Sequence, residues 1–71
     1  MTTAWAVVYI GDDGRRIIAS NTIRRTRRES IEAAIDWLET YDTATIRRAW
    51  RRLRRAGRVA CVRVEVREVE G

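Results

Sequence analysis

The side chains with the most evident chemistry in this sequence of 71 residues are its arginines. All 15 basic residues are arginine, because the sequence contains neither lysine nor histidine. Without histidine there is no Ser/His or Cys/His pair and no imidazole metal ligand, and without lysine there is no Schiff base and no P-loop. Guanidinium groups bind carboxylates and phosphates in a bidentate manner. We therefore expect a protein that recognises anions, is not an enzyme, and uses no cofactor, metal or small-molecule substrate.

The positive charge is concentrated in one segment, residues 47–58. This segment contains seven arginines and no acidic residue, although the formal net charge of the whole chain is only +5. Such a localised field predicts a binding surface rather than a generally basic protein. The predicted partner-binding residues are Arg47, Arg48, Arg51, Arg52, Arg54, Arg55 and Arg58. A second, smaller cluster comprises Arg24, Arg25, Arg27 and Arg28.

Two other groups of polar residues are weaker candidates. Asp12 and Asp13 lie between two glycines, a context typical of a hairpin turn, and further ligands for a metal are missing from their neighbourhood in the sequence. Cys61 is the only cysteine, which excludes an intramolecular disulfide and favours a small packing residue in a reducing compartment. We interpret neither group as a catalytic or metal site.

The smaller arginine cluster leads into a predicted amphipathic helix that begins at the cap residue Thr26 and ends before a short break at Tyr41-Asp42-Thr43. Thr26-Arg27-Arg28-Glu29 matches a capping box, in which the threonine hydroxyl accepts from an N–H group of the first turn and the glutamate reaches back to the threonine amide. Apolar residues at i, i+3, i+4 and i+7 form one stripe: Ile31, Ala34, Ile35 and Leu38. Acidic residues form another: Glu29, Glu32, Asp36 and Glu39.

The larger arginine cluster lies on a second predicted helix, with Asp42 or Thr43 as its N-cap and Gly57 as the residue after its C-cap. Its apolar stripe repeats the same spacing with Ile46, Ala49, Trp50 and Leu53. The short break between the helices predicts an antiparallel helix pair. Some arginines could pair with the acidic side of the first helix, but four acidic residues cannot neutralise seven arginines.

Segments with strand character flank the helices and predict the fold. Residues 3–10 and 15–20 form a β-hairpin around Gly11-Asp12-Asp13-Gly14, and residues 58–70 return to period two. In this last strand Ala60, Val62, Val64 and Val66 share one face. The sequence thus predicts one domain over residues 1–71, an α+β, two-layer ββααβ fold with both helices on one face of a three-stranded sheet. We place the first strand at the centre, because both of its faces are apolar.

The sheet face away from the helices provides a second candidate surface. We expect Trp5, Val7 and Tyr9 on this face, beside Arg63 and Arg67. An open face of this kind is usually covered by a second copy of the chain or by a partner protein, and it can also stack the bases of single-stranded nucleic acid. We therefore expect Trp5, Val7 and Tyr9 to form an interface, with a homodimer as one outcome.

The sequence resembles small proteins encoded by phages and prophages of GC-rich bacteria. The segments that carry the resemblance are residues 26–33, residues 50–59 and the valine-rich last strand. In size and composition the chain is similar to anti-CRISPR proteins, and this resemblance implies an inhibitor that binds a host Cas effector complex and catalyses nothing. Many anti-CRISPR proteins are acidic mimics of nucleic acid, whereas this chain is basic, so its expected target is an acidic protein surface or bound nucleic acid.

Three functional hypotheses follow for a protein that we expect in the cytoplasm of a bacterial host. The first is the phage-type inhibitor, which docks its arginine-rich helix on a host protein complex. The second is a small protein that binds the phosphate backbone of nucleic acid through the same arginines. The third is an assembly protein that only dimerises. No run of apolar residues is long enough for a membrane span, and we expect no membrane association.

Overall fold

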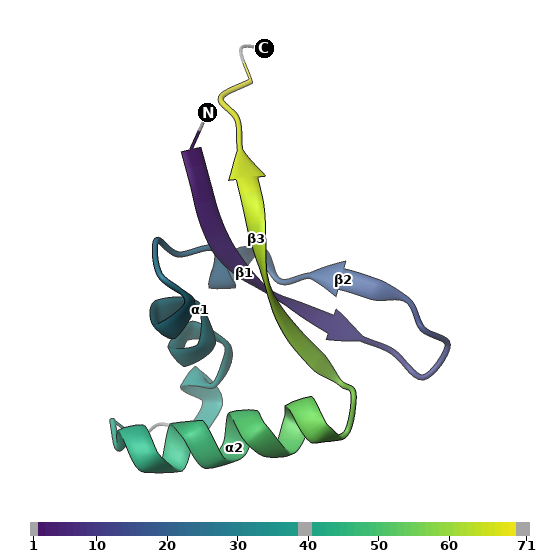
Figure 1. Ribbon diagram of the computed structural model, residues 1–71, viewed down its shortest axis with the longest axis vertical. Coiled ribbons are helices and arrows are strands. Elements are labelled where there is room, and N and C mark those ends of the chain that lie inside the picture. Colours follow the sequence, from purple (N-terminus) through teal and green to yellow (C-terminus); the bar gives the residue numbers. More distant parts are fainter. Residues whose placement is uncertain (1, 39–40, 70–71) are drawn as a thin grey trace.

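The computed structural model describes residues 2–38 and 41–69 and shows an α+β fold. Its antiparallel sheet has three strands, β1 (Thr2–Ile10), β2 (Arg16–Ile18) and β3 (Val59–Val66), in the order β2-β1-β3. The prediction that the first strand is central is therefore confirmed. Figure 1 shows β1 and β3 crossing the middle of the molecule as a long, bent pair, with α1 to one side of them and α2 below. No helix in the described ranges is long and apolar enough to cross a membrane.

The return strand of the hairpin is shorter than the sequence predicts. Gly14 adopts a positive φ of 81°, which favours glycine, and the carboxylate of Asp13 accepts a hydrogen bond of 3.0 Å from the backbone N–H of Arg15. The return strand has only three residues rather than six. After β2 the chain enters a single 3-10 turn, η1 (Ser20–Thr22), so the rest of the β1 edge needs other partners.

Thr22 and Arg24 supply those partners. The hydroxyl of Thr22 accepts a hydrogen bond of 2.8 Å from the N–H of Val7 and donates one of 2.6 Å to the carbonyl of Ala19. Arg24 forms an isolated antiparallel bridge to Trp5, with two backbone hydrogen bonds of 2.8 and 2.9 Å. The backbone groups of this central strand are thereby paired where β2 does not reach, as burial requires.

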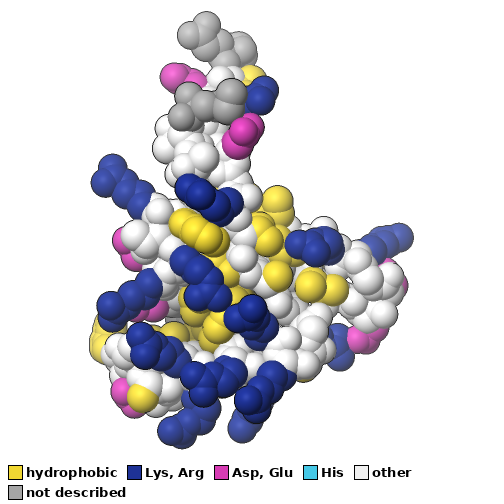
Figure 2. Space-filling view, in the orientation of Figure 1, with side chains coloured by type: hydrophobic (Ala, Val, Ile, Leu, Met, Phe, Trp, Pro, Cys, Tyr) yellow, Lys and Arg dark blue, Asp and Glu magenta, His cyan; other side chains and the backbone are white. Residues whose placement is uncertain are grey.

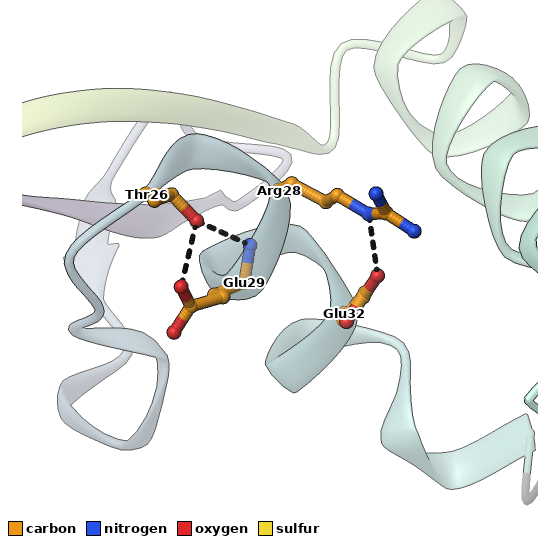
Figure 3. A network of polar contacts seen from close by, with 4 residues as sticks. All are labelled: Thr26, Arg28, Glu29 and Glu32. Atoms are coloured by element: carbon orange, nitrogen blue, oxygen red, sulfur yellow. Dashed lines mark hydrogen bonds and ion pairs between the residues drawn. The ribbon is translucent and has the colours of Figure 1, made fainter.

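The first helix, α1 (Arg27–Ala34), begins at the predicted cap. The hydroxyl of Thr26 accepts a hydrogen bond of 3.1 Å from the N–H of Glu29 and donates one of 3.1 Å to the Glu29 carboxylate (Figure 3). The glutamate thus meets the threonine hydroxyl rather than the amide of a standard capping box. The helix also ends earlier than predicted, at Ala34, and a 3-10 turn, η2 (Asp36–Leu38), follows it.

The second helix, α2 (Thr43–Arg55), agrees with the prediction at both ends. The Asp42 carboxylate caps it by accepting from the N–H of Ala44 at 3.2 Å and from the hydroxyl of Thr45 at 2.6 Å. Gly57, with a φ of 70°, ends it in the left-handed conformation. In Figure 1, α2 runs across the lower end of the molecule while α1 is seen closer to end-on. The predicted antiparallel packing of the two helices is not confirmed.

The core lies between the helices and one face of the sheet. It contains Val7 and Val59 from the sheet and Ile31, Ala34, Ile35 and Trp50 from the helical segment. The four residues of the predicted stripe of α2 all contribute, because Ile46, Ala49 and Leu53 are half-buried against this cluster. Burying a side chain such as Val7 contributes roughly 1.5–3 kcal/mol. The stability of a core with so few residues therefore depends on each of them.

Two predictions about the faces of the sheet are wrong. Val7 is fully buried beneath the helices. Trp5, Val7 and Tyr9, at every second position of β1, therefore share the face that the helices cover and not the opposite one. In β3 the residues that reach the core are Val59 and Cys61, whereas the predicted set beginning at Ala60 lies on the other face. The sheet is apolar on both faces, since Ala4, Ala6 and Val8 are buried as well.

Candidate anion-binding site

The arginines of α2 form two stripes along the helix. Arg47, Arg51 and Arg54 follow the spacing i, i+4, i+7, and Arg48, Arg52 and Arg55 repeat it one residue later. All six side chains are exposed. Figure 2 shows arginine side chains gathered over the lower part of the molecule, where Figure 1 places α2. We call the first set the inner stripe and the second set the outer stripe.

Neither stripe is neutralised by acidic residues within the described part of the chain, where no ion pair involves an arginine of α2. The acidic side of α1 is occupied elsewhere, because Glu29 bonds to its own helix cap and Glu32 pairs with Arg28 at 3.1 Å. Glu39, also expected on that side, lies outside the described residues. The six arginines of α2 thus repel one another in the free protein.

Arg58 differs from the other predicted partner-binding residues. Its guanidinium forms an ion pair with the carboxylate of Asp12 at the tip of the hairpin. Arg15 similarly pairs with Asp13 at 3.2 Å. The two carboxylates of this turn therefore hold arginines, and within the described residues no group of three His, Cys, Asp or Glu side chains could hold a metal ion.

A groove of about 560 Å³ separates the inner stripe from the start of α1. Its apolar lining, which we call the floor, consists of Ile31, Ile46 and Trp50. Five arginines surround this floor: Arg27, Arg28, Arg47, Arg51 and Arg54. Figure 3 shows the side chain of Arg28 extending from α1 into the space between the helices, where it meets Glu32. The fold thus brings together two of the four arginines of the smaller cluster and three of the seven of the larger one around one apolar surface.

Trp50 anchors the floor of this groove. The residue is only 7% exposed, and its indole Nε1–H has no hydrogen-bond partner within the described residues. A buried indole N–H normally finds an acceptor, so this group is an exception among the described residues.

The groove continues past Glu32 into a second hollow of about 490 Å³ with a different charge. Glu32 and Asp36 contribute carboxylates there, and the fully exposed ring of Tyr41 stands at its side. Arg28 is the one arginine that lines this second hollow. The charge along the groove therefore changes from strongly positive beside the inner stripe to mixed beside Asp36.

Other members of the smaller cluster serve the backbone or point to solvent. The guanidinium of Arg24 donates a hydrogen bond of 2.9 Å to the carbonyl of Ile23, in addition to the backbone bridge to Trp5. Arg25 is exposed. Only Arg27 and Arg28 of this cluster reach the groove.

The three residues of the predicted surface on the sheet differ in exposure, because the middle one, Val7, belongs to the core. Val7 has no exposed surface to offer a partner, because the helices cover it. Trp5 is half-buried, and the guanidinium of Arg63 lies 5.6 Å from the centre of its ring, as the cross-strand pair of these residues allows. Tyr9 is 41% exposed. Arg67 lies beyond the end of β3 and pairs with Glu65 at 3.4 Å.

One carboxylate near the arginines has a perturbed acidity. The pKa of Asp42 lies below its ordinary value, first because the Thr45 hydroxyl and then the Ala44 N–H stabilise the ionised form. The charge of Arg48 lowers the pKa further. This carboxylate therefore stays ionised at neutral pH and holds the start of the helix that carries both stripes.

Sequence periodicity correctly assigns the arginines to the exposed side of α2, but it gives no sign of the groove. The groove depends on how α1 is oriented against α2, and the only hint in the sequence is the presence of two separate arginine clusters. In comparisons with protein-family models, curated proteins and solved structures, no match to the chain was found.

Proposed function

We propose that this chain is a non-enzymatic binding protein that docks the arginine face of α2 on an acidic surface of a host protein complex. The proposal follows the resemblance to phage-encoded inhibitors of the anti-CRISPR kind, and it places the protein in the cytoplasm of a bacterial host. The observation that carries it is the set of six exposed arginines on one helix, opposed among the described residues chiefly by the charge of Asp42 near Arg48.

The physical argument is the cost of this arrangement in the free protein. Like charges three and four residues apart destabilise a helix, and exposed arginines that only face solvent contribute little to folding. A partner that supplies carboxylates would relieve the repulsion and gain bidentate hydrogen bonds at the same time. Rim charges of this kind also accelerate association and fix the orientation of docking.

Binding to the phosphate backbone of nucleic acid is the second candidate function. The outer stripe, Arg48, Arg52 and Arg55, favours it because three exposed guanidinium groups on successive turns can follow a line of phosphates. Such binding releases counterions and therefore weakens steeply as salt increases.

Self-association through the sheet also stays a prediction. Of the three residues expected at that interface, Trp5 and Tyr9 retain accessible surface, whereas Val7 does not. A dimer would therefore use the two aromatic residues at the margins of the helix-covered face.

The test is a pulldown from host lysate with the whole chain as bait, with and without nuclease. We expect a captured protein to persist after nuclease treatment and to be lost in R51E/R55E, which reverses one arginine of each stripe. The matched control is R15E/R16E, which reverses two exposed arginines of the hairpin and leaves α2 intact. Binding that disappears with nuclease would favour the phosphate alternative.

A lysine series refines the result. R51K/R55K keeps the charge but removes the planar fork, so a bidentate grip on carboxylates should weaken while a line of phosphates tolerates the change. Full binding by R51E/R55E, with circular dichroism unchanged, would overturn the proposal. The arginines would then be only a solvated face of the helix.

A further inference from the structure

We infer that the groove between α1 and the inner stripe binds an acidic peptide segment that also presents apolar side chains. This inference rests on the proposed function and specifies the kind of surface that α2 recognises. Its basis is the combination of five arginines with an apolar floor, Ile31, Ile46 and Trp50, in one hollow.

Charge complementarity identifies the polar part of the partner. Five arginines line the hollow, and among the described acidic residues only Glu32 lines it too; that carboxylate is already paired with Arg28 at 3.1 Å. Arg47, Arg51 and Arg54 lie on successive turns, about 6 Å apart along the helix for residues four positions apart. Carboxylates that recur at a similar interval on a partner segment can each meet one of them.

The floor identifies the apolar part of the partner. Carboxylates alone would leave the accessible part of the half-buried Ile46 facing water, whereas a leucine or similar side chain between the acidic residues would cover it. Each buried methylene group contributes about 0.8 kcal/mol. A volume near 560 Å³ falls in the range of sites that hold a small ligand, so the hollow accepts a few side chains and not a whole domain.

The same surface is a poor site for nucleic acid. Bases bind single-strand sites by stacking on exposed aromatic rings, but Trp50 is only 7% exposed and offers too little ring surface for stacking. Tyr41 is exposed, yet it stands beside Asp36 and Glu32, whose carboxylates repel phosphates. The observations thus favour a peptide over a nucleic acid in this groove.

The change of charge along the groove also sets the direction of the bound segment. Its acidic residues must lie over the inner stripe, because the second hollow carries Glu32 and Asp36. A segment laid in the reverse direction would place carboxylates against Asp36 and lose this pairing.

The experiment compares two triple variants of the whole chain that lose equal charge from the same helix. R47Q/R51Q/R54Q removes the inner stripe, and R48Q/R52Q/R55Q removes the outer stripe. Glutamine keeps a good helix propensity, and circular dichroism with thermal melting checks both folds. The probe is a fluorescent synthetic peptide of 14 residues in which glutamates alternate with leucines at helical spacing, measured by fluorescence anisotropy.

Two further probes separate the contributions to binding. One is the same peptide with serine in place of every leucine, and the other is a single-stranded oligonucleotide of equal charge. We expect the leucine peptide to bind about tenfold more tightly than the serine peptide. The inner-stripe variant should lose about tenfold or more in affinity for the leucine peptide, and the outer-stripe variant less than about threefold.

Each other outcome has a defined meaning. Equal losses in the two variants would overturn the groove while leaving the wider proposal of an arginine-dependent partner intact. A loss confined to the outer stripe, equal binding of the two peptides, or tighter binding of the oligonucleotide would also overturn the groove. If neither variant loses a probe or a lysate partner that the wild type binds, the proposed function fails as well.

Discussion

Replacing Thr22 with valine tests whether one side chain completes the central strand. The substitution keeps the shape of the residue and removes the hydroxyl, which joins the N–H of Val7 at 2.8 Å to the carbonyl of Ala19 at 2.6 Å. Both Thr22 and Val7 are fully buried, so water cannot replace the lost acceptor without local opening. The carbonyl of Ala19 keeps a second bond, from the N–H of Thr22 at 2.9 Å.

The expected cost is therefore that of one orphaned backbone donor. A buried donor left without a partner costs about 1–3 kcal/mol, and we take about 2 kcal/mol for T22V. A change of this size lowers the melting temperature by about 8–16 °C in a domain of this length. T22S is the control, because it keeps both hydrogen bonds and loses one methyl group, which costs about 1 kcal/mol.

The assays are thermal unfolding followed by circular dichroism and amide hydrogen exchange at Val7. We expect the amide of Val7 to lose protection in T22V and to keep it in T22S, a difference that loss of a methyl group does not produce. The reasoning is refuted if T22V is at least as stable as T22S, or if Val7 exchanges equally slowly in both.

Two further predictions concern the ends of α2. G57A should lower stability by about 1 kcal/mol, because alanine is strained at the φ of 70° that Gly57 adopts. G57N should lose less stability, since asparagine tolerates this region. Equal melting temperatures of wild type and G57A would contradict this prediction. D42N keeps a capping oxygen but loses the charge, so wild type should melt higher than D42N at pH 7. Folding lowers the pKa of Asp42 below 3.8. The higher melting temperature of the wild type should therefore be fully present above that pH and disappear as the pH falls through the lowered pKa. A difference in melting temperature that stays constant in acid would contradict this prediction.

The residues that cap the helices are the most predictable from the sequence. Thr26, Asp42 and Gly57 act through bonds to neighbours only a few positions away, so their roles are visible in local patterns. The apolar stripe of α2 was predicted for the same reason, because helical geometry alone decides which residues share a face.

The features that sequence did not predict depend on contacts between distant segments. β1 is apolar on both faces, so alternation could not tell which face the helices cover, and Val7 was assigned to the wrong one. The bond between Thr22 and Val7 joins residues 15 positions apart, and no periodicity signals it. The groove likewise needs the relative orientation of α1 and α2, which the early end of α1 at Ala34 changes.

The antiparallel pairing of β1 with β3 has a practical consequence for handling the protein. Thr2 pairs with Val66, so the outer ends of these two strands lie side by side. In Figure 1 this pair is at the top of the molecule and α2 is at the bottom. An affinity tag or surface linkage at either strand end would therefore hold the molecule with its arginine helix directed away from the support. The same proximity suits a circular permutant, in which a short linker joins the two strand ends and new termini open in the exposed turn at Asp12 and Asp13.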